Sequence, residues 1–73
     1  MLKGERFGIV RRTQPISIHG QIAFDVFWTD PEDPDGEIRH ARVGQESMPR
    51  DLAPGDQVTF HYLMGMVTKI TKG

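Results

Sequence analysis

Apolar and polar residues alternate with a period of two in several short stretches of the chain. The clearest example is Gln21–Thr29, in which Phe27 falls on the polar side of the alternation. Successive side chains of a strand point to opposite faces of a sheet, so the alternate apolar residues share one buried face. We expect this core face to consist of Ile22, Phe24, Val26 and Trp28.

Four further stretches rich in β-branched and aromatic residues lie between clusters of Gly, Pro and Asp, which is typical of strands. No apolar period of 3.6 residues persists along the chain, so long helices are not expected. Gly8 indicates a bulge or a close approach of another segment. In the predicted strand Glu37–Val43, arginines interrupt the apolar positions. The residues that point into the core are therefore either Ile38 and His40 or Ala41 and Val43. The further predicted strands are Phe7–Thr13, Glu37–Val43, Gln57–Leu63 and Met66–Thr71.

Pro and Gly residues define the connections between these strands. A loop is expected over Ile16–Gly20, and Asp35-Gly36 predicts a turn in which Gly36 adopts a positive φ. Pro49 favours a single helical turn, with Ser47 as its cap. Ala53-Pro54-Gly55-Asp56 has the pattern of a type II turn.

The order of elements is three strands in a meander, a short helical turn and two more strands. A chain of 73 residues allows one domain, which we take as residues 1–73. A closed or nearly closed five-stranded barrel would leave no exposed edges, and the OB-fold has this order of elements. The alternative is an SH3-like barrel, in which Gln14–Gly20 would form an early long loop. The predicted class is therefore an all-β, OB-like barrel.

Charge is unevenly distributed along the chain. The formal net charge is −1, but five of the ten acidic residues lie in Asp30–Glu37. The rest of the chain contains nine Lys and Arg residues and only five acidic residues. The acidic stretch is therefore either a solvated surface loop or an acidic loop beside a basic surface. The chain has no Cys, which fits a reducing compartment, and Met1–Val10 lacks the apolar run of a signal peptide. We therefore expect a cytoplasmic protein with no membrane segment.

Residues suited to catalysis or metal binding do not form a recognisable pattern. His19, His40 and His61 are too widely spaced for a standard zinc motif. Aligning Gly36 with the glycine of an EF-hand puts Pro31 at the first ligand position. No Gly-rich phosphate loop is present. We expect no catalytic residues, no cofactor and no metal.

Three segments resemble the cold-shock domain, a small OB barrel. Arg6-Phe7-Gly8-Ile9-Val10 is similar to its Gly-Phe-Gly-Phe-Ile motif, and Asp25-Val26-Phe27 to its Asp-Val-Phe-Val-His motif. Leu52–Phe60 resembles the entry into its fourth strand. The resemblance implies a non-catalytic barrel that binds single-stranded RNA or DNA.

Binding of a single strand requires aromatic rings for the bases and cations for the backbone. Arg11 and Arg12 are neighbours in a strand, so at least one should point outward. The alternative is a protein-interaction module that docks on a larger assembly through Phe27, Trp28 and the acidic loop. The predicted nucleic-acid-binding residues are Phe7, Arg11, Arg12, Phe27, Arg39, Arg42, His61 and Lys69.

Overall fold

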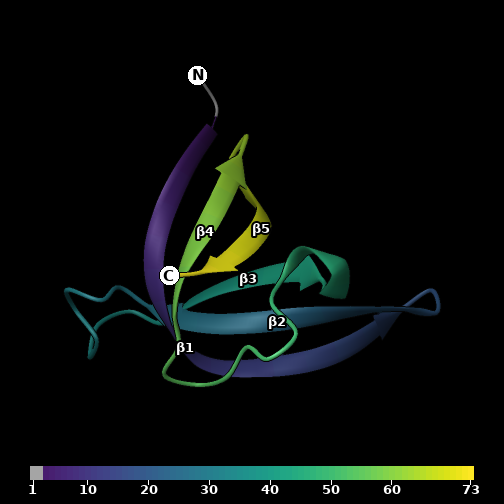
Figure 1. Ribbon diagram of the computed structural model, residues 1–73, viewed down its shortest axis with the longest axis horizontal. Coiled ribbons are helices and arrows are strands. Elements are labelled where there is room, and N and C mark those ends of the chain that lie inside the picture. Colours follow the sequence, from purple (N-terminus) through teal and green to yellow (C-terminus); the bar gives the residue numbers. More distant parts are fainter. Residues whose placement is uncertain (1–2) are drawn as a thin grey trace.

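The computed structural model describes residues 3–73, which form a single five-stranded antiparallel sheet (Figure 1). Across the sheet the strands lie in the order β3-β2-β1-β4-β5. No α-helix occurs among these residues, so the prediction of an all-β chain with five strands is confirmed. The strands are β1 (Lys3–Ile18), β2 (Gln21–Thr29), β3 (Arg39–Gly44), β4 (Gln57–Leu63) and β5 (Met66–Lys72).

β1 is shared between the two halves of the sheet. Its residues Lys3–Ile9 pair with β4, and Ile9–Ile18 pair with β2. A shift of register between Val10 and Arg12 leaves Arg11 as an extra residue. Such a bulge bends a strand, and β1 changes direction along its length in Figure 1. The bulge also allows both Arg11 and Arg12 to be exposed, although they are neighbours.

The predicted end of this strand at Thr13 was wrong, because β1 continues to Ile18. Beyond Ile9, β1 pairs with β2 alone among residues 3–73, so no second strand needs the N–H that Pro15 lacks. The loop predicted over Ile16–Gly20 is only a tight turn at His19 and Gly20, whose φ angles are 51° and 80°. Positive φ at both central residues is the geometry that favours a hairpin.

The sheet curls but does not close, which corrects the prediction of a closed or nearly closed barrel. β3 and β5 form its two edges, and they contact each other without being paired. β3 has only six residues, and all of them pair with β2. The chain leaves the sheet directly after Gly44 and turns into a 3₁₀ turn over Gln45–Ser47.

The core lies on the concave side of the curled sheet. Trp28 and Phe60 stack at its centre, with ring centroids 4.3 Å apart. A Cβ on Gly8 would lie 2.5 Å from Trp28 Cε3 and 2.7 Å from Phe60 Cε2, so the predicted close approach at Gly8 is confirmed. The buried hydrophobic residues are Val10, Val26, Trp28, Ala41, Val43, Val58, Phe60 and Ile70. This set decides the facing of β3: Ala41 and Val43 point inward.

Ile22 is an exception to the predicted core face, because its side chain is 40% exposed. The last pair between β2 and β3 joins Ala23 to Gly44. Ile22 therefore lies on the part of the β1–β2 hairpin that extends past β3, to the right in Figure 1. Phe24, one pair further inward, packs against the core.

Two of the predicted connections differ from the structure. The 3₁₀ turn over Gln45–Ser47 ends before Pro49, so Ser47 is not a cap. Gly36 does not have a positive φ. Its N–H instead donates to the carbonyl of Asp33 at 2.9 Å, which places Gly36 at the last position of a turn, where glycine is also favoured.

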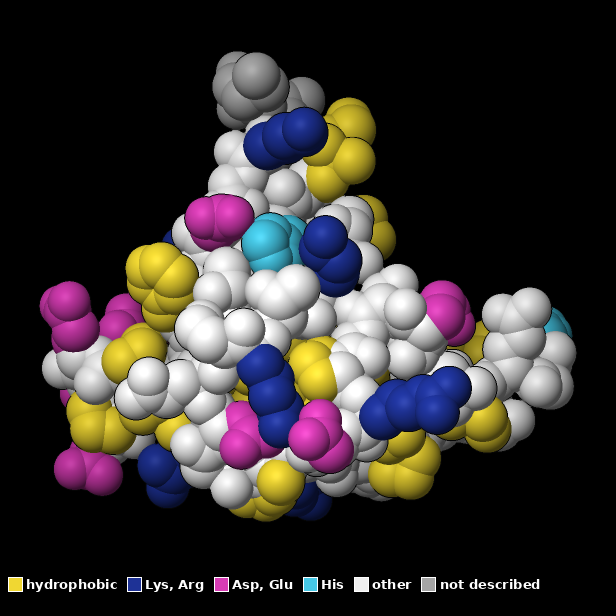
Figure 2. Space-filling view, in the orientation of Figure 1, with side chains coloured by type: hydrophobic (Ala, Val, Ile, Leu, Met, Phe, Trp, Pro, Cys, Tyr) yellow, Lys and Arg dark blue, Asp and Glu magenta, His cyan; other side chains and the backbone are white. Residues whose placement is uncertain are grey.

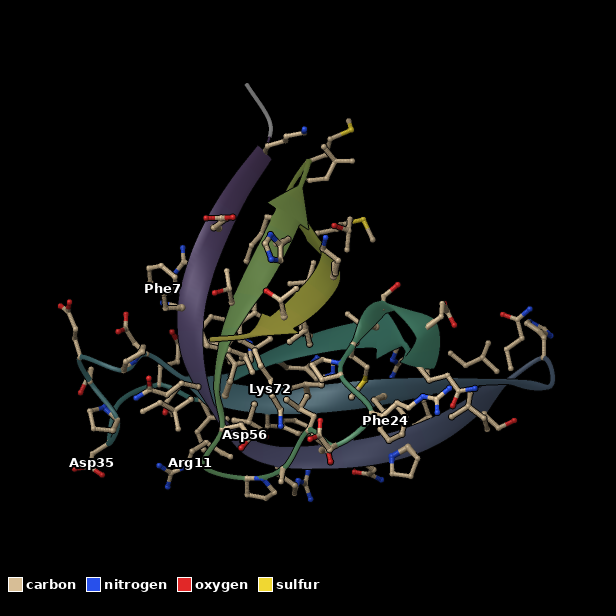
Figure 3. All side chains as sticks on the ribbon, viewed as in Figure 1. Phe7, Arg11, Phe24, Asp35, Asp56 and Lys72 are labelled. Carbon is tan, nitrogen blue, oxygen red and sulfur yellow. The ribbon has the colours of Figure 1, made fainter. Side chains whose placement is uncertain are left out.

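The connection from β3 to β4 is held against β5 at its far end. Gly55 has a φ of 95°, and the Asp56 N–H donates to the Ala53 carbonyl at 3.1 Å, which confirms the type II turn. The Lys72 ammonium lies 3.1 Å from an Asp51 carboxylate oxygen and 3.4 Å from one of Asp56 (Figure 3). Within residues 3–73, no helix is long and apolar enough to cross a membrane.

Candidate nucleic-acid interface

An aromatic ring and several ionisable groups meet on the outer face of β1, β2 and β3. Cross-strand pairing sets Arg12, Phe27 and His40 in one row and Asp25 beside Arg42 in the next. We call these five residues the Phe27 cluster. The prediction that Phe27 points away from the core, with Val26 and Trp28 buried, is confirmed.

Phe27 is half-buried because two side chains lie against its ring. The Arg12 guanidinium carbon is 4.5 Å from the ring centroid, the geometry of a cation–π contact. The His40 ring lies on the opposite neighbouring strand, 5.1 Å away and tilted by 31°. Phe27 is therefore held in place between a cation and a second planar ring.

Asp25 orients the remaining members of the cluster. Its Oδ1 accepts a hydrogen bond from Arg42 Nε at 2.8 Å, and its Oδ2 accepts one from Arg42 Nη2 at 3.3 Å. His40 Nε2 lies 3.0 Å from the same Oδ1. The hydrogen bonds from Arg42, followed by that from His40, lower the pKa of Asp25 from 3.8 to about 2. Asp25 therefore stays ionised and fixes Arg42 by a two-point contact.

The lowered pKa of Asp25 predicts a loss of stability in acid. A depressed carboxyl pKa stabilises the fold above the pKa of the unfolded chain, and this contribution disappears as the pH falls through the folded value. Arg42→Gln removes the main cause, so the wild type should melt at a higher temperature near pH 6. The difference should shrink from about pH 4 to about pH 2. Thermal melts by circular dichroism at each pH measure this difference.

A matched control is Glu46→Gln, which neutralises an exposed carboxylate on the 3₁₀ turn outside the cluster. Its melting temperature should follow that of the wild type at every pH. A difference between wild type and Arg42→Gln that stays constant down to pH 2 would contradict the role assigned to the Asp25 pair.

Arg11 and Arg39 lie outside the Phe27 cluster. Arg11 is exposed at the bulge of β1, one residue from Arg12. The Arg39 guanidinium carbon lies 5.6 Å from the ring centroid of Trp28, and its Nη2 is 3.8 Å from a Glu37 carboxylate oxygen. Arg39 thus covers the edge of the core, because its position in β3 alternates with that of His40.

His61 and Lys69 lie on the other half of the sheet, where they pair across β4 and β5. His61 Nε2 shares a hydrogen bond with Thr71 Oγ1 at 2.9 Å, and its Nδ1 lies 3.4 Å from a Glu5 carboxylate oxygen. The β1 partner of His61 is Glu5, seven residues before Arg12, which corresponds to about 23 Å along an extended strand. The structure therefore does not bring this pair together with Phe27.

Phe7 is 64% exposed on the outer face of β1, as a binding residue requires. It lies beside Asp30, Pro31 and Glu32, however, rather than beside the arginines of the Phe27 cluster. Trp28, the second aromatic residue expected at a protein-docking surface, is 1% exposed. That part of the alternative was wrong, because Trp28 is on the core face of β2.

Asp25 and His40 belong to the cluster but were not among the predicted site residues. The alternation in β2 already places Asp25 on the same face as Phe27, which was an available signal. His40 required the facing of β3 and its register with β2, and neither followed from its interrupted pattern. Among residues 3–73, no three His, Asp or Glu side chains gather closely enough to hold a metal ion.

Comparison of the chain with protein-family models, with curated proteins and with solved structures found no match.

Proposed function

We propose that this protein binds single-stranded RNA or DNA, without catalysis, through the Phe27 cluster. The observation that carries the proposal is the Phe27 ring on an outer sheet face, with the Arg12 guanidinium 4.5 Å from its centroid. Proteins that bind single strands combine aromatic rings, on which bases stack, with cations that follow the backbone. Guanidinium planes also stack on bases, so a base can stack on the outer side of the Arg12 guanidinium, which itself lies over the Phe27 ring.

We also propose that the curled sheet is a partly open, OB-like fold. The OB-fold is a five-stranded, partly open barrel that binds oligonucleotides on the face of its second and third strands. Its loops between strands 1 and 2 and between strands 4 and 5 take part in binding. Here the second and third strands carry Phe27, His40 and Arg42, which supports this assignment.

The charges of the cluster favour modest affinity. Arg12 and Arg42 are cationic, and Arg11 is exposed at the neighbouring bulge. Asp25 offsets one of these charges, since both oxygens of its carboxylate accept hydrogen bonds from Arg42. Arg42 Nη1 takes no part in this contact and can still reach a phosphate, so we expect about three phosphate contacts, from Arg11, Arg12 and Arg42.

A salt titration with a labelled mixed-sequence oligonucleotide tests the proposal. Each phosphate contact on a single strand contributes about −0.7 to the slope of log K against log salt, so three contacts predict about −2. Raising the salt from about 50 to about 200 mM should then weaken binding roughly 15-fold. Arg42→Gln should make the slope shallower by about 0.7.

Lys69→Gln is the matched control, because it removes one cation from the other half of the sheet. Its slope should equal that of the wild type. Absence of binding at low salt, or an equal change for both variants, would overturn the assignment of this face.

A further inference from the structure

The outer face of the N-terminal half of β1 carries a groove whose chemistry differs from that of the Phe27 cluster. The groove has a volume of about 540 Å³ and surrounds Phe7. We call it the Phe7 groove. Its exposed apolar surface comes from Phe7 and Pro31, its carboxylates from Glu5, Asp30 and Glu32, and its one cation from Arg6. Val58 also borders the groove, but its side chain is buried in the core.

Three segments distant in sequence build the groove. Glu5 and Phe7 alternate onto the same face of β1, where they pair with His61 and Thr59 of β4. The chain leaving β2 forms the opposite wall. There, Asp30 Oδ1 accepts a hydrogen bond from the Glu32 N–H at 2.8 Å, which holds the first turn of the loop in a defined shape.

The Phe7 side chain is exposed in this groove, with 64% of its surface accessible to solvent. In Figure 3 its side chain points outward on the flank that also carries Asp35, and Figure 2 shows acidic and hydrophobic side chains together on that flank. An exposed ring beside several carboxylates attracts a cation by two interactions: a cation–π contact with the ring face and electrostatic attraction to the carboxylates. The same carboxylates repel phosphate, so the groove is unsuited to a nucleic acid.

We propose that the Phe7 groove docks a segment of a partner protein that bears Lys or Arg. A cationic side chain fits this site because its alkyl stem can pack on Pro31 while its charged head lies over the Phe7 ring, near Glu32. The carboxylates outnumber the single guanidinium of Arg6, and Asp33, Asp35 and Glu37 of the same loop extend the negative field. This interaction does not depend on nucleic-acid binding at the Phe27 cluster.

The probe for this site is a short synthetic peptide of alternating arginine and alanine, titrated into the ¹⁵N-labelled protein without nucleic acid. The largest amide shifts should fall on Phe7, Gly8, Glu32 and Val58. Phe7→Ala should weaken peptide binding about tenfold, because the contact with the ring is lost. Glu32→Gln should weaken it less, since the other carboxylates remain.

Two control variants separate a built site from general attraction. Met66→Ala removes another exposed apolar side chain, and Glu46→Gln removes a carboxylate outside the groove. Both should bind the peptide as the wild type does. Shifts spread evenly over the acidic loop, wild-type affinity of Phe7→Ala, or an equal loss in Glu46→Gln would each overturn the proposal. Oligonucleotide binding by Phe7→Ala should be unchanged, so this test and that of the Phe27 cluster can fail separately.

Discussion

Gly8→Val is expected to destabilise the domain by about 3 kcal/mol or more, at the upper end of what overpacking of a core produces. The first added carbon alone would lie 2.5 Å from Trp28 and 2.7 Å from Phe60. Both rings are essentially fully buried and stacked on each other, so neither has free space to move into. Chemical denaturation or thermal melting should detect this loss, which is a large part of the roughly 4 to 11 kcal/mol available to a chain of 73 residues.

Gly4→Val provides the control on the same strand. A Cβ at Gly4 would meet no atom within 4 Å, and its φ is not in the left-handed region. This variant should melt close to the wild type, because valine suits a strand and has space at this position. Equal melting of the Gly8 and Gly4 variants would mean that Trp28 and Phe60 do not pack against β1 at Gly8.

Phe27→Ala is expected to weaken binding of a single-stranded oligonucleotide by about 1 to 3 kcal/mol, or roughly 5- to 150-fold. The ring supplies the stacking surface of the proposed site and also positions the Arg12 guanidinium. Stability should change little, because Phe27 lies outside the buried core around Val26 and Trp28. Fluorescence anisotropy gives the affinity, and a melt of the same sample confirms the fold.

Phe7→Ala removes the same kind of side chain from a more exposed position on β1. It should leave oligonucleotide affinity unchanged, because acidic side chains surround Phe7. An unfolded Phe27→Ala protein would place Phe27 in the core, and an equal loss of affinity in both variants would contradict a site centred on Phe27.

The two proposed sites occupy different parts of one outer surface. Phe27 lies where β1 pairs with β2, and Phe7 lies where β1 pairs with β4. The bulge at Arg11 separates these two halves of the strand. A nucleic acid and a basic protein segment could therefore be bound at the same time, each on a surface of opposite charge.

The local sequence pattern determined which strand residues are buried and where one turn lies. The alternation in β2 sufficed to bury Val26 and Trp28 and to point Phe27 outward, because successive side chains of a strand must alternate. The type II turn at Gly55 was likewise encoded locally, since only a few residue types accept a positive φ. Glycine at position 8 also indicated a close contact, because only a residue without a side chain leaves room for Trp28 and Phe60.

Tertiary structure decided which residues meet. The pairing of Phe27 with His40, and of Asp25 with Arg42, depends on the register of two strands that are joined by a long loop. The exposure of both Arg11 and Arg12 depends on the bulge at Arg11, since an unbroken alternation would have sent these two residues to opposite faces.

Two further features could not be predicted from the local sequence pattern: burial at the ends of strands and closure of the sheet. Ile22 has the periodicity of a core residue, yet it is exposed because β3 ends before reaching it. β3 and β5 touch without pairing, and this outcome depends on strand lengths and curvature rather than on composition. Periodicity therefore determined which face of each strand is apolar, and long-range pairing alone determined what that face packs against.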